Sequence, residues 1–151
     1  MKELERQEDF VMTPRQALGL LCKLVYKKFG KDTLPIIEEV CFKLGIADGQ
    51  RIKKGMPNLS FKTAQERFLH NARKKGIDTE IIELTETKRH TKFYGPCILR
   101  LENTSRELCE AAMVLDKAMF ETAIGRKLNL KILKTLAAGD PYCEVLWTLS
   151  E

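Results

Sequence analysis

The stretch T-L-A-A-G-D-P-Y-C-E-V-L-W, residues Thr135 to Trp147, predicts a strand, a tight turn and a second strand. Gly139 can adopt a positive φ at no steric cost, and Pro141 restricts the residue before it to an extended conformation. Beyond the turn, alternate residues of a strand point to the same side of the sheet. One side of the last strand is apolar and should face a core, because it carries Cys143, Val145, Trp147 and Leu149.

Two strands and a helix precede this hairpin. The third strand of the chain begins after that helix and continues into the hairpin as its first strand. Residues 79–84 and 89–94 are rich in β-branched and aromatic residues, with a turn between them. The sequence T-S-R-E at residues 104–107 is a capping box for a helix that ends at Gly125. The segment after this helix alternates apolar and polar residues until Leu133, where the alternation slips and we expect a bulge or a twist.

The first half of the chain shows three helical patterns. T-P-R-Q at residues 13–16 supplies an N-cap and a first-turn proline for a helix that stops at Gly30. Asp32 is placed to cap a second helix, which we expect to end before Gly45. A third helix covers about residues 60–75.

The predicted order is three helices, two strands, one helix and two strands. Two hairpins separated by a helix indicate a four-stranded antiparallel sheet, with helices over at least one of its faces. We therefore predict an α+β fold in which N-terminal helices are followed by ββαββ. We expect a single domain over residues 1–151, with a loop over 46–58 and a flexible N-terminus over 1–12.

The composition, 44% hydrophobic and 31% charged, is that of an ordinary soluble domain. Spanning a bilayer takes about 20 consecutive apolar residues, and the sequence has no such run. The charged N-terminus does not resemble a signal peptide. We therefore expect a cytoplasmic protein without a membrane partner, whose five cysteines are reduced thiols.

The net charge of +5 is concentrated in one segment. Eight basic residues and one acidic residue lie between positions 50 and 76. Such a run can contact nucleic acid or an anionic ligand. No nucleic-acid motif accompanies it, so we favour a solvated loop and helix surface and do not expect nucleic-acid binding.

Three cysteines and a carboxylate form the candidate site. Cys97 follows a strand, Cys143 opens the last strand, and Cys109 shares a helix face with Asp116, seven residues later. Three interpretations stay open: the thiols are packing residues, reactive or ligand-contacting groups, or zinc ligands. The spacing lacks a C-x-x-C pair and a nearby histidine, so we expect no cofactor and no metal, with zinc as the minor alternative.

These residues also carry a family resemblance. Tyr94-Gly-Pro-Cys97, Leu108-Cys109-Glu110, Asp116 and the stretch 135–143 resemble the C-terminal pattern of the L-2-amino-thiazoline-4-carboxylic acid hydrolase family. The match covers about residues 60–150. That family is distantly similar to vinyl reductase-type ligand-binding domains and to the nitric oxide and Golgi-transport ligand-binding fold, in which helices pack on an antiparallel sheet around an apolar pocket. The closing cysteine can bind zinc there, but Ile132 and Thr135 occupy the positions where further zinc ligands would be needed.

The resemblance implies hydrolysis of a thiazoline ring to N-carbamoyl-cysteine. In that reaction Cys97 or Cys109 would attack as a thiolate, and Asp116 would accept a proton. Four further residues would bind the substrate: Cys143, Asp140, Arg100 and Lys134. Either Arg100 or Lys134 could bind the substrate carboxylate.

A domain that binds a small molecule without converting it remains the alternative to the hydrolase. An apolar pocket with a few polar groups suits both functions. The expected partner is in either case a small molecule, and a homodimer is kept open beside a monomer.

Overall fold

The computed structural model describes residues 11–151 of the chain. Four strands form one sheet in the order β1-β2-β4-β3, and every neighbouring pair is antiparallel. The α+β fold predicted from the sequence is confirmed, whereas the expectation for residues 1–12 falls almost entirely outside the described residues. The elements follow the chain as α2 (Pro14–Phe29), η1 (Gly30–Thr33), α3 (Leu34–Gly55), α4 (Phe61–Lys74), β1 (Asp78–Leu84), β2 (Lys88–Gly95), α5 (Arg106–Ile124), β3 (Leu128–Lys134), η2 (Leu136–Ala138) and β4 (Cys143–Leu149).

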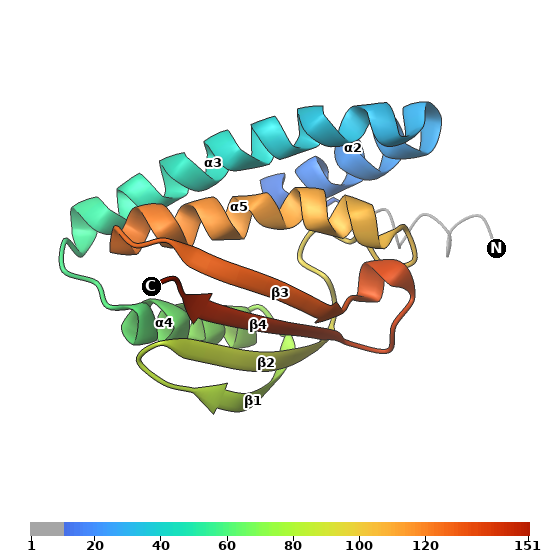
Figure 1. The fold of residues 1–151 in the computed structure, drawn as a ribbon. Coiled ribbons are helices and arrows are strands. Elements are labelled where there is room, and N and C mark those ends of the chain that lie inside the picture. Colours follow the sequence, from blue (N-terminus) through green and yellow to red (C-terminus); the bar gives the residue numbers. More distant parts are fainter. Residues whose placement is uncertain (1–10) are drawn as a thin grey trace.

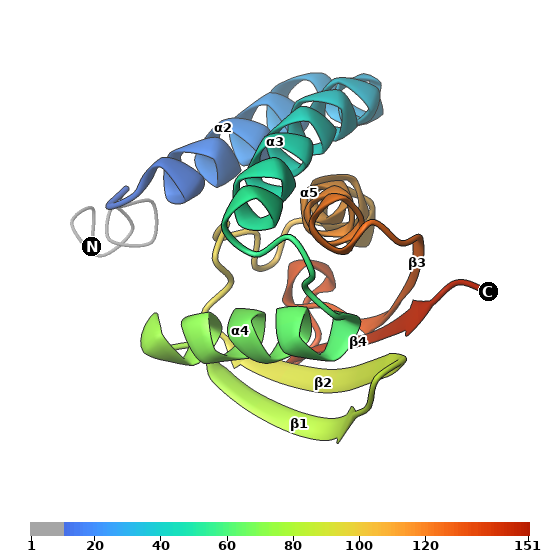
Figure 2. The ribbon, with the colours of Figure 1, turned by 90° about the vertical axis from the view of Figure 1, so that its left-hand side faces the viewer.

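The elements stack in layers on one side of the sheet (Figures 1 and 2). Helix α4 lies over the β1–β2 hairpin, and α5 runs beside it along β3. Helices α2 and α3 form a hairpin that covers α5 on the side away from the sheet. Among residues 11–151, no helix is both long enough and apolar enough to cross a bilayer.

Short polar side chains begin the helices, largely as predicted. Thr13 accepts a hydrogen bond from the Gln16 amide at the start of α2. Ser60 and Ser105 cap α4 and α5 in the same way, so the α5 cap lies one residue after the predicted Thr104. Each cap satisfies an amide that the first helical turn leaves free.

The second helix is much longer than predicted. Asp32 lies in the 3₁₀ turn η1, Thr33 is the residue before α3, and the helix continues through Gly45 and Gly49 to Gly55. The predicted loop over 46–58 was therefore wrong for most of its length. The two internal glycines are sites of close helix packing, because a Cβ on either would collide with α5. In this chain they allow the contact between α3 and α5 and do not end a helix.

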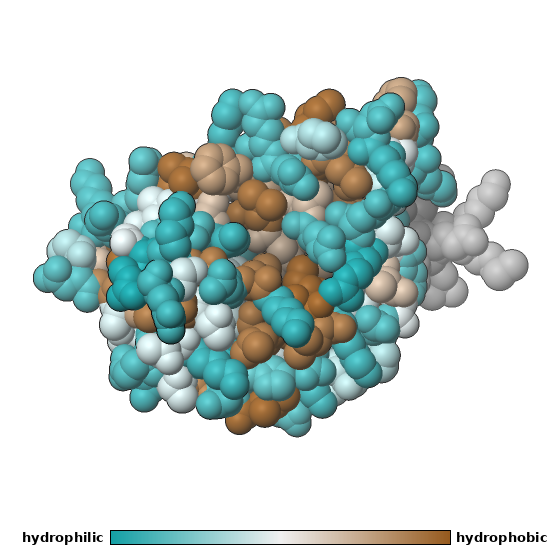
Figure 3. Space-filling view, viewed as in Figure 1, coloured by the Kyte–Doolittle hydropathy of each residue, from teal (hydrophilic) through white to brown (hydrophobic). Residues whose placement is uncertain are grey.

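The basic segment spans the end of α3, a short loop and α4. Of its eight basic residues, seven are exposed and Lys62 is half-buried. The charges therefore lie in solvent as predicted, although residues 50–55 are helical and not loop. Apolar surface also reaches solvent over the helical layer at the top of Figure 3. Helices α2 and α3 expose Leu21, Leu24, Ile36 and Val40.

Two apolar cores hold the layers together. One lies among α2, α3 and α5 and includes Cys22, Cys41 and Leu108. The other joins α4 and α5 to the sheet and is centred on Trp147, which is fully buried, with Phe120 packed edge-on at 5.2 Å between ring centroids. The predicted inward face of the last strand is confirmed.

The segment between β3 and β4 differs in part from the predicted hairpin. The register of β3 shifts between Ile132 and Lys134, which confirms the irregularity expected at Leu133. The chain then leaves the sheet, and residues Leu136–Ala138 form a 3₁₀ turn where a strand was expected. Gly139 has a φ of 88° and ends this turn, so its predicted role is confirmed.

Candidate functional site

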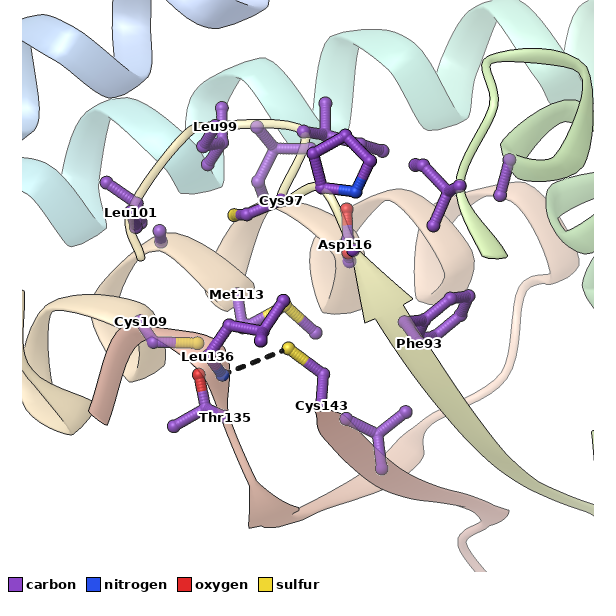
Figure 4. Close-up of a pocket in the computed structure, with 18 of the residues that line it drawn as sticks. Phe93, Cys97, Leu99, Leu101, Cys109, Met113, Asp116, Thr135, Leu136 and Cys143 are labelled. Atoms are coloured by element: carbon purple, nitrogen blue, oxygen red, sulfur yellow. Dashed lines mark hydrogen bonds between the residues drawn. The ribbon is translucent and has the colours of Figure 1, made fainter. Parts of the chain in front are cut away.

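A cavity of about 290 Å³ lies between α5, the inner face of the sheet and the loop that follows β2 (Figure 4). Its walls are mostly apolar. Side chains that point into it include Phe93 from β2, Met113 from α5 and Leu136 from η2. A concave, mostly apolar space of this kind is the usual form of a small-molecule site.

The three predicted thiols meet in this cavity. Cys97 comes from the loop after β2, Cys109 from α5 and Cys143 from the first position of β4. The Leu136 amide donates a hydrogen bond to the sulfur of Cys143 at 3.3 Å. The side chain of Thr135 lies within hydrogen-bonding reach of Cys109 and Cys143. The structure therefore places three cysteines from separate elements around one cavity.

The thiols hold their protons at neutral pH. Burial raises the pKa of Cys109 to about 11 and also raises the pKa of Cys97 and of Cys143. The neighbouring hydrogen bonds act in the opposite direction but are the smaller effect. A thiol reacts as its thiolate, so this environment favours packing and ligand contact over nucleophilic attack.

Among residues 11–151, no group of three or more histidine, cysteine or acidic side chains is arranged to hold a metal ion. The cavity wall at β3 and the turn after it carries Ile132 and Thr135. Neither side chain is a usual zinc ligand.

Asp116 faces the cavity from α5 and is half-buried (Figure 4). Burial raises the pKa of this carboxyl, while the charges of Arg15 and Arg89 act in the opposite direction. Arg15 is itself ion-paired with Asp48 of α3. Asp116 therefore places a carboxyl group inside an apolar space, with cations near it but none in an ion pair with it among the described residues.

The other predicted binding residues are placed differently. Lys134 lines the cavity and lies over the ring of Tyr142, 4.9 Å from its centroid. Arg100 is exposed and does not line the cavity. Asp140 also lies outside the lining, where its carboxylate accepts a hydrogen bond from the Thr135 amide at 2.9 Å and stabilises the turn.

Arg89 of β2 lines the cavity, and the sequence argument missed it. Its side chain is 1% exposed and donates a hydrogen bond to Gln65 of α4 at 2.7 Å. Burial lowers its pKa to about 9, so the guanidinium stays charged at neutral pH. Its position could have been predicted from the strand pattern. Period-two alternation places Arg89 on the same side of the sheet as Phe93 and on the opposite side from His90.

Comparison with known proteins shows what kind of fold surrounds this cavity. No protein-family model matches the sequence, and no curated protein matches it. The phenol-responsive sensory domain of the transcription activator PoxR, solved with phenol, is 13% identical, with a TM-score of 0.59 over 93% of this chain and 76% of that one. A trafficking protein particle complex subunit 3 from Naegleria fowleri, covalently bound to palmitic acid, is 14% identical, with a TM-score of 0.66 over 91% of this chain and 95% of that one.

At these identities the similarity shows the fold alone. The chain therefore shares its architecture with two proteins that hold small molecules, and the similarity to a hydrolase family rests only on the sequence motifs.

Proposed function

We propose that this chain is a ligand-binding domain that takes up a small, largely apolar molecule in its cavity and does not convert it. The observation that carries this proposal is the apolar cavity, whose lining includes one inward-facing carboxyl group and three protonated thiols. The volume supports a ligand the size of a substituted aromatic ring, since a cavity of roughly 150 Å³ already binds benzene.

The two similar structures support the same function. One is a sensory domain solved with phenol, and the other holds palmitic acid. Fold likeness alone does not transfer a ligand. The fold likeness supports the proposal only because this chain also has a cavity between the sheet and its central helix α5.

Hydrolysis of a thiazoline ring is the less favoured function. It would need a thiolate or an activated water in contact with the substrate. The raised pKa values of Cys97, Cys109 and Cys143 leave little thiolate at neutral pH. We expect no N-carbamoyl-cysteine when the protein is incubated with 2-amino-thiazoline-4-carboxylate, and its formation at a rate abolished by Cys109→Ser would overturn the proposal.

Binding is tested first on the protein as purified. Denaturing extraction followed by mass spectrometry should release a small molecule in an amount comparable to that of the protein. Ala112 is buried and lines the cavity, so Ala112→Leu should fill part of the space and reduce the amount released. Ala17 is exposed on α2, and Ala17→Leu should leave the amount unchanged. Equal release from all three proteins would place the molecule outside the cavity.

A further inference from the structure

Four buried polar groups without a hydrogen-bond partner gather between α4 and the sheet. They are Gln65 Nε2, Arg89 Nε, Thr91 Oγ1 and Trp147 Nε1, and each belongs to a side chain that is at most 1% exposed. Arg89 connects them, because it bonds Gln65 and pairs with Trp147 across the strands β2 and β4. Buried polar groups are normally satisfied, so a cluster of this kind requires an explanation.

The cluster surrounds a positive charge that lacks an acidic partner. Within residues 11–151, no carboxylate forms an ion pair with Arg89; Asp116 influences its charge only from a greater distance. Three aromatic rings surround the guanidinium carbon, with centroids 5.1 Å (Phe68), 5.7 Å (Phe93) and 5.9 Å (Trp147) away. Rings of this kind stabilise a cation but accept none of its strong hydrogen bonds.

The cavity reaches this charge. Arg89, Phe68 and Phe93 all contribute to its lining, so the guanidinium lies at the edge of the cavity, and because Arg89 is 1% exposed a ligand that bonds it must enter between these rings. A buried guanidinium with free donor capacity matches a planar carboxylate well, because the two groups can form paired charge-assisted hydrogen bonds. We propose that the ligand of this cavity is an apolar monocarboxylic acid whose carboxylate binds Arg89.

The surrounding charges favour a single negative charge over a phosphate. Asp116 already contributes a carboxyl to the same cavity, and Arg15 is neutralised by Asp48. A doubly charged phosphate would therefore meet stronger repulsion from Asp116 than a singly charged carboxylate does, and it would lose more hydration on entering the cavity. The volume of about 290 Å³ leaves room beyond the carboxylate for a ring and a short chain.

This inference rests on the proposed function, and its test separates the two. Isothermal titration calorimetry compares 3-phenylpropanoate with its neutral isostere, 3-phenylpropanamide. On the native protein the acid should bind at least about tenfold more tightly, which corresponds to about 1.4 kcal/mol. Equal affinities would overturn the carboxylate assignment and leave the binding function standing.

Variants assign the preference to one side chain. Arg89→Met replaces the buried charge with an apolar chain and should remove the preference for the acid while the amide still binds. Arg67→Gln changes an exposed arginine on α4 and should keep the native preference. Circular dichroism checks that both variants are folded. A preference that survives in Arg89→Met would overturn the assignment to Arg89.

The molecule extracted from the purified protein gives a second readout that needs no variant. We expect it to be a carboxylic acid, and a neutral molecule would overturn the inference. If neither probe binds and nothing is extracted, the proposed function itself fails.

Discussion

Gly45 of α3 lies directly against the backbone of Leu115 in α5, with no space for a methyl group between them. A Cβ at Gly45 would also stand 2.8 Å from the Cβ of Ala118, closer than real Cβ atoms approach one another. One turn later, a Cβ at Gly49 would lie 2.6 Å from the Met119 carbonyl oxygen. The two helices therefore approach each other at positions where one of them lacks side chains, and this contact supports the wall of the cavity.

Gly45→Ala should destabilise the protein by about 1–3 kcal/mol, because the added methyl group forces backbone atoms apart in a packed interface. Chemical denaturation followed by circular dichroism measures the change in the free energy of unfolding. Gly55 is a matched control in the same helix, since nothing lies within 4 Å of its added Cβ. Gly55→Ala should be neutral or stabilising by up to about 1 kcal/mol. Equal losses at both positions would contradict close packing at Gly45.

Trp147→Ala should cost about 3–5 kcal/mol, because it removes the largest buried side chain of the sheet core. Thermal unfolding monitored by far-UV circular dichroism measures the loss without depending on tryptophan emission. Phe29 is 62% exposed at the end of α2, and Phe29→Ala should stay within about 0.5 kcal/mol of the native protein. A small effect at Trp147 would mean that the core between α4 and the sheet is loosely packed.

Asp116→Asn should stabilise the ligand-free protein at pH 7. Burial raises the pKa of Asp116 in the folded state, so the folded protein binds this proton more tightly than the unfolded chain does. Stability contributed by this group is therefore lost as the pH rises from the ordinary pKa of a carboxyl through the raised pKa of the folded protein, and asparagine removes that loss.

The gain from Asp116→Asn should disappear at a pH near 3, where the native carboxyl is protonated in both states. Thermal melts at pH 7 and pH 3 measure both differences. Asp78 is exposed in β1, and Asp78→Asn serves as the control with little change at either pH. A variant less stable than the native protein at pH 7 would show that the attraction of Arg15 and Arg89 outweighs the cost of burial.

Cys109 should react slowly with iodoacetamide at pH 7, since its pKa of about 11 leaves very little thiolate. The rate should continue to rise above pH 9, where an ordinary free cysteine is already mostly ionised. Mass spectrometry of the alkylated peptides follows Cys97, Cys109 and Cys143 separately in one sample. A Cys109 rate that levels off below pH 8 would indicate an activated thiolate and would revive the hydrolase.

The fold was largely readable from the sequence because its signals are local. Ser and Thr caps, the αL glycine at Gly125 and the period-two strands each act over a few residues. Gly45 and Gly49 misled the sequence argument for the opposite reason. A glycine that ends a helix and one that lets another helix approach are identical in the sequence, and only the position of α5 distinguishes them.

The candidate site was readable in part for a related reason. Cys109 and Asp116 share a helix face by their spacing, and Cys143 lies on the apolar face of a strand, so their convergence followed from local geometry. Arg89 was missed because arginine in a strand is normally exposed, and its burial depends on Gln65 and Phe68 of α4 and on Trp147 of β4, which are far from it in the sequence.

The position of β4 in the sheet has a consequence for how the chain folds. β4 follows every other strand in the chain, yet it lies between β2 and β3 and pairs with both. During synthesis, the β1–β2 hairpin and β3 emerge first and have no hydrogen-bonded connection until β4 arrives. Closure of the sheet therefore depends on contacts between residues far apart in the chain, such as Arg89 and Trp147, and such contacts slow folding. Until then, the edges of β2 and β3 that β4 later covers stay open to pairing with other chains.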